Sequence, residues 1–167
     1  MSQRLKHLLV SSIVIFSFFV SLAEIKLPAI IADNMVLQQN SNIKLWGWAN
    51  AGEKVTVTAS WSKSPVSVVT DNDGKWILSI KTIKAGGPYT IKFAASNTIE
   101  VSNVVLGEVW LASGQSNMEF FMKKMSGGYT GVLNYEEEIK AADYPLIRTI
   151  DVPNKVSDDP QTDFVGK

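Results

Sequence analysis

Short stretches of alternating apolar and polar residues fill the chain from Ile25 to Val105. Turn residues interrupt them about every eight to twelve positions, as in β-sandwiches and barrels, where each strand buries one face. Asp73-Gly74, Asn50-Ala51-Gly52 and Gly86-Gly87-Pro88 are the turn sequences. The pattern indicates an all-β sandwich, with a barrel as the alternative. The expected strands are residues 43–48, 54–60, 66–70, 76–80, 89–94 and 98–101.

After Asn103 the hydrophobic pattern changes. Residues 104–112 form a nearly continuous apolar run, which is typical of a strand buried on both faces of a parallel sheet. Met118, Phe121, Met122 and Met125 then recur at helical spacing, which predicts an amphipathic helix that ends at residues 126–128.

A second helix is expected over residues 134–142, because Asn134 can cap it with Glu137 at the third helical position. Pro145 would end that helix, and residues 146–152 read as the next strand. Strand, helix, helix and strand predict the first crossover of an α/β domain whose sheet is unfinished. We therefore expect an N-terminal fragment of a longer enzyme, with a β-sandwich domain at 24–103 and an incomplete α/β domain at 104–167.

The first 23 residues resemble a secretory signal peptide. Arg4 and Lys6 precede an apolar run from Leu8 to Val20, and Ser21-Leu22-Ala23 supplies small residues for cleavage. A membrane anchor is the alternative, but the run is shorter than the roughly 18 to 20 residues that span a bilayer. We expect a cleaved signal at 1–23, a secreted or periplasmic protein, and no membrane association after cleavage.

Composition limits the chemistry of the mature chain. Cleavage would leave 14 of the 16 basic residues and all 16 acidic ones. This balance provides no excess of positive charge for binding nucleic acid. It would also remove His7, the single histidine, and the chain has no cysteine. Without histidine and cysteine we expect neither a disulfide framework nor a His/Cys metal site.

Ser116 is the candidate nucleophile. It lies in the segment GEVWLASGQSNMEF (residues 107–120), where an apolar run ends in a Gly-Gln-Ser-Asn turn before a predicted helix. Such a junction exposes the hydroxyl and points backbone N–H groups at a developing oxyanion. The alternative is that Ser116 or Ser113 only caps the helix. Met118 stands where the second glycine of a Gly-x-Ser-x-Gly elbow would be, which disfavours an α/β-hydrolase fold.

The same segment closely resembles the nucleophile block of sialate O-acetylesterases, secreted members of the SGNH (GDSL-like) hydrolase superfamily. The similarity extends to LPAIIADNMVLQQ, IKLWGWANAGEKVTV, DNDGKW, GGPYTIKF, NVVLGEVW and ADYPLIRTIDVP, so it covers about residues 27–152. The resemblance implies that the α/β part is the start of an SGNH-like, flavodoxin-like three-layer hydrolase domain. It also implies an esterase that removes O-acetyl groups from sugars, either sialic acid or another glycan.

Carried over to this sequence, the resemblance makes Ser116 the nucleophile, with its own backbone N–H as one oxyanion donor. Gly114, Gln115 and Asn117 would shape the turn. The family's activating Asp/His pair and its other oxyanion residues have no counterpart here, so we assign no base and expect little turnover from this chain alone. Five aspartates read instead as solvated loop or strand-end acids: Asp143, Asp151, Asp158, Asp159 and Asp163. The implied mechanism needs no cofactor and no metal.

The tryptophans of the β part raise another possibility. Trp46 and Trp48 share one face of a strand, and Trp61 and Trp76 lie on neighbouring runs, so exposed indoles would form a platform for sugar rings. The alternative is that they fill the core. A carbohydrate-binding module, or a scaffold that packs against the hydrolase domain, is therefore the other interpretation of the β part.

Overall fold

A computed structural model describes residues 24–128 and 130–164, so the predicted signal peptide lies outside the described residues. The regular secondary structure of the described residues is mostly β-strand, with few helices. The strands are β1 (Val36–Gln38), β2 (Asn42–Trp48), β3 (Lys54–Ala59), β4 (Val66–Val69), β5 (Lys75–Lys81), β6 (Gly86–Ala94) and β7 (Thr98–Gly107). The helical elements of the described residues are η1, a 3-10 turn (Ser116–Glu119), and α1 (Tyr135–Ala141).

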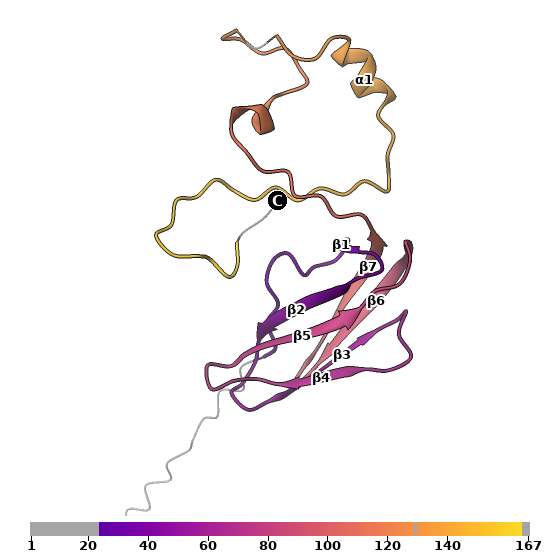
Figure 1. Ribbon diagram of the computed structural model, residues 1–167, viewed down its shortest axis with the longest axis vertical. Helices are drawn as coiled ribbons and strands as arrows, with labels where there is room; N and C mark the ends of the chain where they lie inside the picture. Colours follow the sequence, from indigo (N-terminus) through magenta and orange to yellow (C-terminus); the bar gives the residue numbers. More distant parts are fainter. Residues whose placement is uncertain (1–23, 129, 165–167) are drawn as a thin grey trace, which may run out of the picture.

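The strands form two sheets, which together make the β unit (residues 24–107; Figure 1). One sheet has five strands in the order β1-β7-β6-β3-β4, and the other pairs β2 with β5. The β1–β7 pair is parallel, with Gln38 opposite Gly107, and the other strand pairs are antiparallel. Six of these strands match the expected ranges to within a few residues at each end, except that β7 continues to Gly107.

The core of the β unit receives side chains from both sheets, because each strand buries alternate residues. In β5 the alternation is strict: Trp76, Leu78 and Ile80 are buried, and the residues between them are exposed. Opposite them lie Phe93 and Val57, each at most 1% exposed, and the ring centroids of Trp76 and Phe93 are 5.9 Å apart. The period of two thus identified the core face correctly.

Asp71 and Gly74 explain the tight turn between β4 and β5, which belong to different sheets. One carboxylate oxygen of Asp71 accepts from the backbone N–H groups of Asp73 at 3.0 Å and Lys75 at 2.8 Å. Gly74 has φ 73°, a left-handed conformation that glycine adopts without strain. The Asp73-Gly74 turn that the sequence predicts is confirmed.

The prediction of a parallel-sheet strand over residues 104–112 is wrong. Residues 104–107 instead complete β7 inside the five-stranded sheet, and residues 108–115 have no regular structure. Trp110 and Leu111 are 87% and 92% exposed. An apolar run indicates only that its residues prefer burial, not which sheet buries them. Here residues 104–107 are covered within the β unit, whereas residues 108–112 are exposed.

The two expected helices have different outcomes. The prediction of an amphipathic helix after Ser116 is wrong, since only the single turn η1 forms there. The apolar residues of the predicted helix are about half exposed: Met118, Phe121, Met122 and Met125. A short helix depends on packing of its apolar face for stability, and about half of the surface of these side chains stays exposed. The second helix is confirmed as α1.

The expected cap of α1 and the following strand are wrong in detail. Asn134 has φ 58° and makes no side-chain cap hydrogen bond; its carbonyl accepts from the N–H of Glu138 at 3.0 Å. Residues 146–152 form no strand, although Tyr144 accepts a turn hydrogen bond from Ile147 at 2.9 Å.

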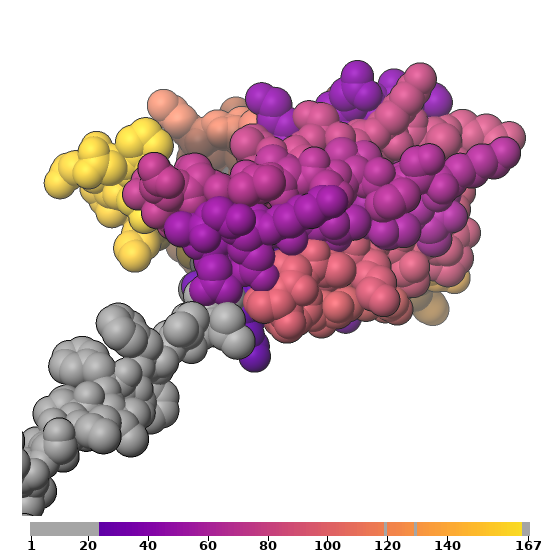
Figure 2. Space-filling view, turned by 90° about the horizontal axis from the view of Figure 1, so that it is seen from below, coloured from indigo at the N-terminus to yellow at the C-terminus, as the bar shows by residue number. Residues whose placement is uncertain are grey.

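The last described residues return to the β unit, where the yellow end of the chain lies beside it in Figure 2. The backbone N–H of Ala29 donates to the carboxylate of Asp163 at 2.7 Å, and the indole N–H of Trp46 lies 3.5 Å from the carbonyl of Thr162. Asp163 is half-buried and also accepts from the N–H of Phe164 at 2.9 Å. The prediction that Asp163 is a solvated acid is therefore wrong.

Candidate active site

The segment that carries Ser116 leaves the β unit at the end of β7. Residues 108–115 run without helix or strand to η1, which begins at Ser116 (Figure 1). The turn is closed by the N–H of Met118, which donates to the carbonyl of Gln115 at 2.8 Å. Ser116 is exposed, so its hydroxyl is accessible to solvent and to a substrate.

Gly114 and Gln115 have identifiable roles in this turn. A Cβ at position 114 would lie 2.8 Å from Cγ of Met118, so a larger residue requires that side chain to move. Gln115 is the residue before η1 and makes no side-chain cap hydrogen bond. Asn117 lies inside the turn and is exposed. Because Gln115 holds the N-cap position, the alternative in which Ser116 or Ser113 caps this helical turn is not supported.

Candidate bases are scarce in the part of the chain that the structure describes. The single histidine, His7, lies outside it. Four of the five aspartates considered from the sequence are exposed: Asp143, Asp151, Asp158 and Asp159. Among residues 24–128 and 130–164, the hydrogen bonds and ion pairs join no acid to Ser116, so these ranges bring together the turn residues of the predicted site without a catalytic base.

Glu108 anchors the start of the serine segment and was not predicted as a site residue. Its carboxylate accepts from Nε2 of Gln38 at 3.0 Å and from Nε2 of Gln39 at 2.8 Å. These two hydrogen bonds hold the pKa of Glu108 below its ordinary value, because they favour the ionised carboxylate. No sequence signal pairs residues about seventy positions apart, so this contact could be found only from the fold.

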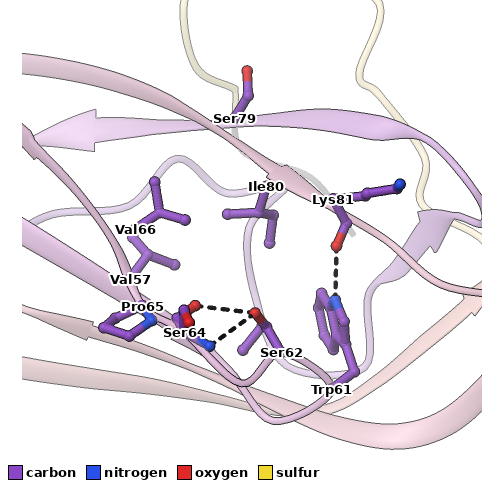
Figure 3. A pocket seen from close by; sticks show the side chains of 10 residues that line it. Val57, Trp61, Ser62, Ser64, Pro65, Val66, Ser79, Ile80 and Lys81 are labelled. Carbon is purple, nitrogen blue, oxygen red and sulfur yellow. Dashed lines mark hydrogen bonds between the residues drawn. The ribbon is translucent and has the colours of Figure 1, made fainter.

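A cavity of about 220 Å³ lies elsewhere, between β5 and the loop after β3 (Figure 3). Val57 and Ile80 line its apolar side, and the indole of Trp61 borders it. The Trp61 N–H donates to the carbonyl of Lys81 at 3.0 Å, and the Ser62 hydroxyl donates to the carbonyl of Ser64 at 3.0 Å. These polar groups already have protein partners, so the cavity offers few free donors to a sugar.

The tryptophans divide between core and surface. Trp76 is 3% exposed and belongs to the core. Trp46, Trp48 and Trp61 are half-buried, and the Lys26 ammonium lies 5.7 Å from the Trp48 ring centroid. The four indoles therefore do not form one exposed platform.

Within the described ranges, no group of three or more histidine, cysteine, aspartate or glutamate side chains is arranged to hold a metal ion. No helix in those ranges is both long and apolar enough to cross a membrane.

Comparison with known proteins identifies relatives of this chain. It is 30% identical to the sialate O-acetylesterase of Rattus norvegicus in an alignment over 145 residues, and the match covers 79% of this chain and 25% of the rat protein. It is 34% identical to the sialate O-acetylesterase of Homo sapiens in an alignment over 101 residues, and the match covers 53% of this chain and 19% of the human protein. The chain thus spans a quarter or less of the curated relatives it matches.

A solved structure agrees with these relatives. The crystal structure of a carbohydrate acetylesterase from Xanthomonas citri matches with a TM-score of 0.72 and 30% identity, over 86% of this chain and 31% of that chain. A scan against models of protein families finds no match. The resemblance to sialate O-acetylesterases is confirmed, and these homologues are esterases by name.

Proposed function

We propose that this homologue of sialate O-acetylesterases is part of a serine esterase that hydrolyses O-acetyl esters of sugars, sialic acid or another glycan. The observation that carries the proposal is the agreement between two comparisons: sequence relatives that are sialate O-acetylesterases and a structural neighbour that is a carbohydrate acetylesterase. The exposed position of Ser116 at the start of η1 supports its role as the nucleophile.

The proposed reaction is acyl transfer. The Ser116 hydroxyl attacks the acetyl carbonyl and loses its proton to a base, and the tetrahedral oxyanion accepts hydrogen bonds, one of them from the Ser116 N–H. The intermediate collapses when the sugar oxygen leaves with a proton. Water then hydrolyses the acetyl-serine and releases acetate. Gly114, Gln115 and Asn117 keep the turn tight enough for the hydroxyl to project, and no step needs a cofactor.

The base and the remaining oxyanion donors are proposed to come from further chain. The described residues contain no histidine, and removal of the base from a serine hydrolase lowers kcat by orders of magnitude. We therefore infer that the chain 24–167 alone turns over acetyl esters slowly or not at all. A histidine codon in frame beyond codon 167 would support this view, and a stop codon directly after it would count against it.

We infer a β-sandwich for the β unit, followed by the start of an SGNH-type domain, and export through a signal peptide at residues 1–23. The shared core of the two sheets supports the sandwich. The β unit then acts as the scaffold on which the serine segment is mounted. A carbohydrate-binding role is the second candidate, and the half-buried Trp46 and Trp48 on the outer face of β2 are what favour it.

Imidazole supplied in solution tests the nucleophile directly, because it replaces the histidine base that residues 24–167 do not contain. Purified residues 24–167 are incubated with p-nitrophenyl acetate or O-acetylated sialic acid, with and without imidazole. The expected result is acetate release above the rate of imidazole alone, lost in Ser116→Ala and kept in Ser113→Ala, a matched change three residues away. Mass spectrometry should find the acetyl group on Ser116. Equal rates for both variants and the parent would refute the role of Ser116.

A further inference from the structure

We propose that Glu108, Gln38 and Gln39 form a positioning lock that fixes the direction in which the serine segment leaves the β unit. Glu108 is the residue directly after β7, and the two glutamines are at the end of β1 and just beyond it. The role of this lock in catalysis rests on the proposed function, whereas the hydrogen bonds that form the lock do not. Glu108 is a positioning residue, not a catalytic one.

The carboxylate of Glu108 is held at both oxygens. Oε2 accepts from Gln38 at 3.0 Å and Oε1 accepts from Gln39 at 2.8 Å. Because two neighbouring residues each take one oxygen, the carboxylate cannot rotate without losing a hydrogen bond. A single contact would leave that rotation free.

The two glutamine amides are themselves oriented by backbone groups. Oε1 of Gln38 accepts from the N–H of Val109 at 3.0 Å, and Oε1 of Gln39 accepts from the N–H of Ala85 at 2.8 Å. Each amide therefore uses its oxygen for a backbone donor and its nitrogen for Glu108. Reversing either amide would place a donor against a donor and an acceptor against an acceptor.

The lock continues the pairing of β1 with β7. Gln38 lies opposite Gly107 in the parallel register, and the N–H of Gln39 donates to the carbonyl of Gly107 at 2.9 Å. Between residues 108 and 118 of the described chain, hydrogen bonds to the β unit are found at Glu108 and Val109. The eight residue-to-residue steps from Glu108 to Ser116 can reach at most about 26 to 29 Å, so Ser116 stays within that distance of the anchored Glu108.

A pair of exchanged residues separates the lock from a general effect on folding. Glu108→Gln leaves one acceptor oxygen at position 108. That oxygen can accept from only one of the two glutamine amides, and the new amide nitrogen faces the other donor. Gln38→Glu places two carboxylates together. In Q38E/E108Q the new carboxylate at position 38 accepts from the new amide at position 108 and from Val109, while Gln39 still donates to position 108. The double variant therefore restores all these hydrogen bonds, and only the one between positions 38 and 108 has its donor and acceptor exchanged.

The position of the segment is measured by pulsed electron paramagnetic resonance. The chain has no cysteine, so Thr58→Cys on β3 and Asn117→Cys beside Ser116 take spin labels at two exposed sites. The matched control is Glu100→Gln, the same chemical change at an exposed residue of β7. Hydrogen exchange at the Val109 amide and urea unfolding are followed in every variant.

A narrow distance distribution is expected for the parent, Glu100→Gln and the double variant. The two single variants should broaden the distance distribution. They should also raise the rate of hydrogen exchange at the Val109 amide by about tenfold, because each loses a hydrogen bond to a charged group. Unchanged distributions in both single variants, or no recovery in the double variant, would overturn the lock. These readings do not depend on ester hydrolysis, so a failure of the proposed function and a failure of the lock remain distinguishable.

Discussion

The guanidinium of Arg148 donates to the side-chain oxygen of Asn103 at 3.1 Å, and this contact ties the chain after α1 to the β unit. The other terminal nitrogen donates to the backbone carbonyls of Asn103 and of Asn34, the latter at 3.0 Å. Asn34 and Asn103 have φ 68° and 54°, and the side-chain amide of Asn103 donates to that of Asn34 at 2.6 Å. A forked cation thus joins two residues with left-handed backbone conformation, one of them inside β7.

Arg148→Lys should loosen residues 143–152 while leaving the β unit folded. The ammonium of lysine is a compact donor that cannot match the three acceptors of the planar guanidinium, so about 1 kcal/mol of local stability should be lost. Hydrogen exchange at Ile147, whose N–H donates to Tyr144 at 2.9 Å, measures the effect. Lys155→Ala, at an exposed position shortly after this segment, is the control. Equal exchange in Arg148→Lys and the parent would contradict this role.

The β unit could be predicted from sequence because its signal is local. Strict alternation in β5 and the Asp73-Gly74 turn are both contained in a few consecutive residues. β1 escaped prediction because three residues (Val36–Gln38) carry too little periodicity, and its parallel partner β7 lies about seventy residues away.

The chain after β7 was predicted less well because its apolar residues remain exposed in the described structure. Met118 and Met125 follow a helical period, yet both remain about half exposed and no helix of that length forms. Helix formation in water needs tertiary packing as well as period. α1 was predicted correctly since its acidic first turn, residues 136–138, and Lys140 near its end suit the helix dipole locally.

The candidate site divides in the same way. The serine turn was found because Gly114 to Asn117 are adjacent in sequence, whereas the Glu108 contacts with Gln38 and Gln39 depend on strand pairing. The role of Ser116 stays a prediction that the imidazole experiment tests.

Glu53 should make the stability of the β unit depend on pH. Burial raises the pKa of this carboxyl, but hydrogen bonds from Asn50 and Ser96 outweigh it and hold the pKa below the ordinary value of 4.5. The ionised form therefore stabilises the fold, fully above pH 4.5, and this contribution is lost as pH falls through the folded pKa.

Urea unfolding of the parent and Glu53→Gln as a function of pH measures this effect. The variant should be less stable near pH 7, and the difference should shrink between about pH 5 and pH 3. Glu100→Gln corrects for the change in net charge. A difference that stays constant over this range would argue against the ionised carboxylate as the cause.

Thr82→Val should destabilise the β unit although the side chains have similar shapes. Thr82 is 1% exposed; its hydroxyl donates to the carbonyl of Gln38 at 2.6 Å and accepts from the N–H of Ser41 at 2.9 Å. Valine leaves both backbone groups without that partner, which costs about 1 to 3 kcal/mol. Urea unfolding should show this loss, with less than about 0.5 kcal/mol for Thr58→Val at an exposed site. Equal losses at both positions would contradict the hydrogen-bonding argument.

Gly47→Ala should destabilise the β unit because the methyl group has no room. A Cβ at position 47 would lie 2.8 Å from Cζ2 of Trp76 and would also collide with the carbonyl of Lys26. That carbonyl accepts from the N–H of Trp48 at 2.9 Å, so it cannot retreat without breaking a backbone hydrogen bond. The indole is also confined, since Trp76 is 3% exposed and packs near Phe93.

The expected loss for Gly47→Ala is about 2 kcal/mol or more, the range for overpacking against an immobile neighbour. Urea unfolding followed by tryptophan fluorescence measures it. Gly107→Ala is the matched control, because the nearest atom to its new Cβ is Cγ1 of Val36 at 3.9 Å, an ordinary contact distance. If Gly47→Ala proves as stable as Gly107→Ala, the close packing of Trp76 over β2 is not what requires glycine at this position.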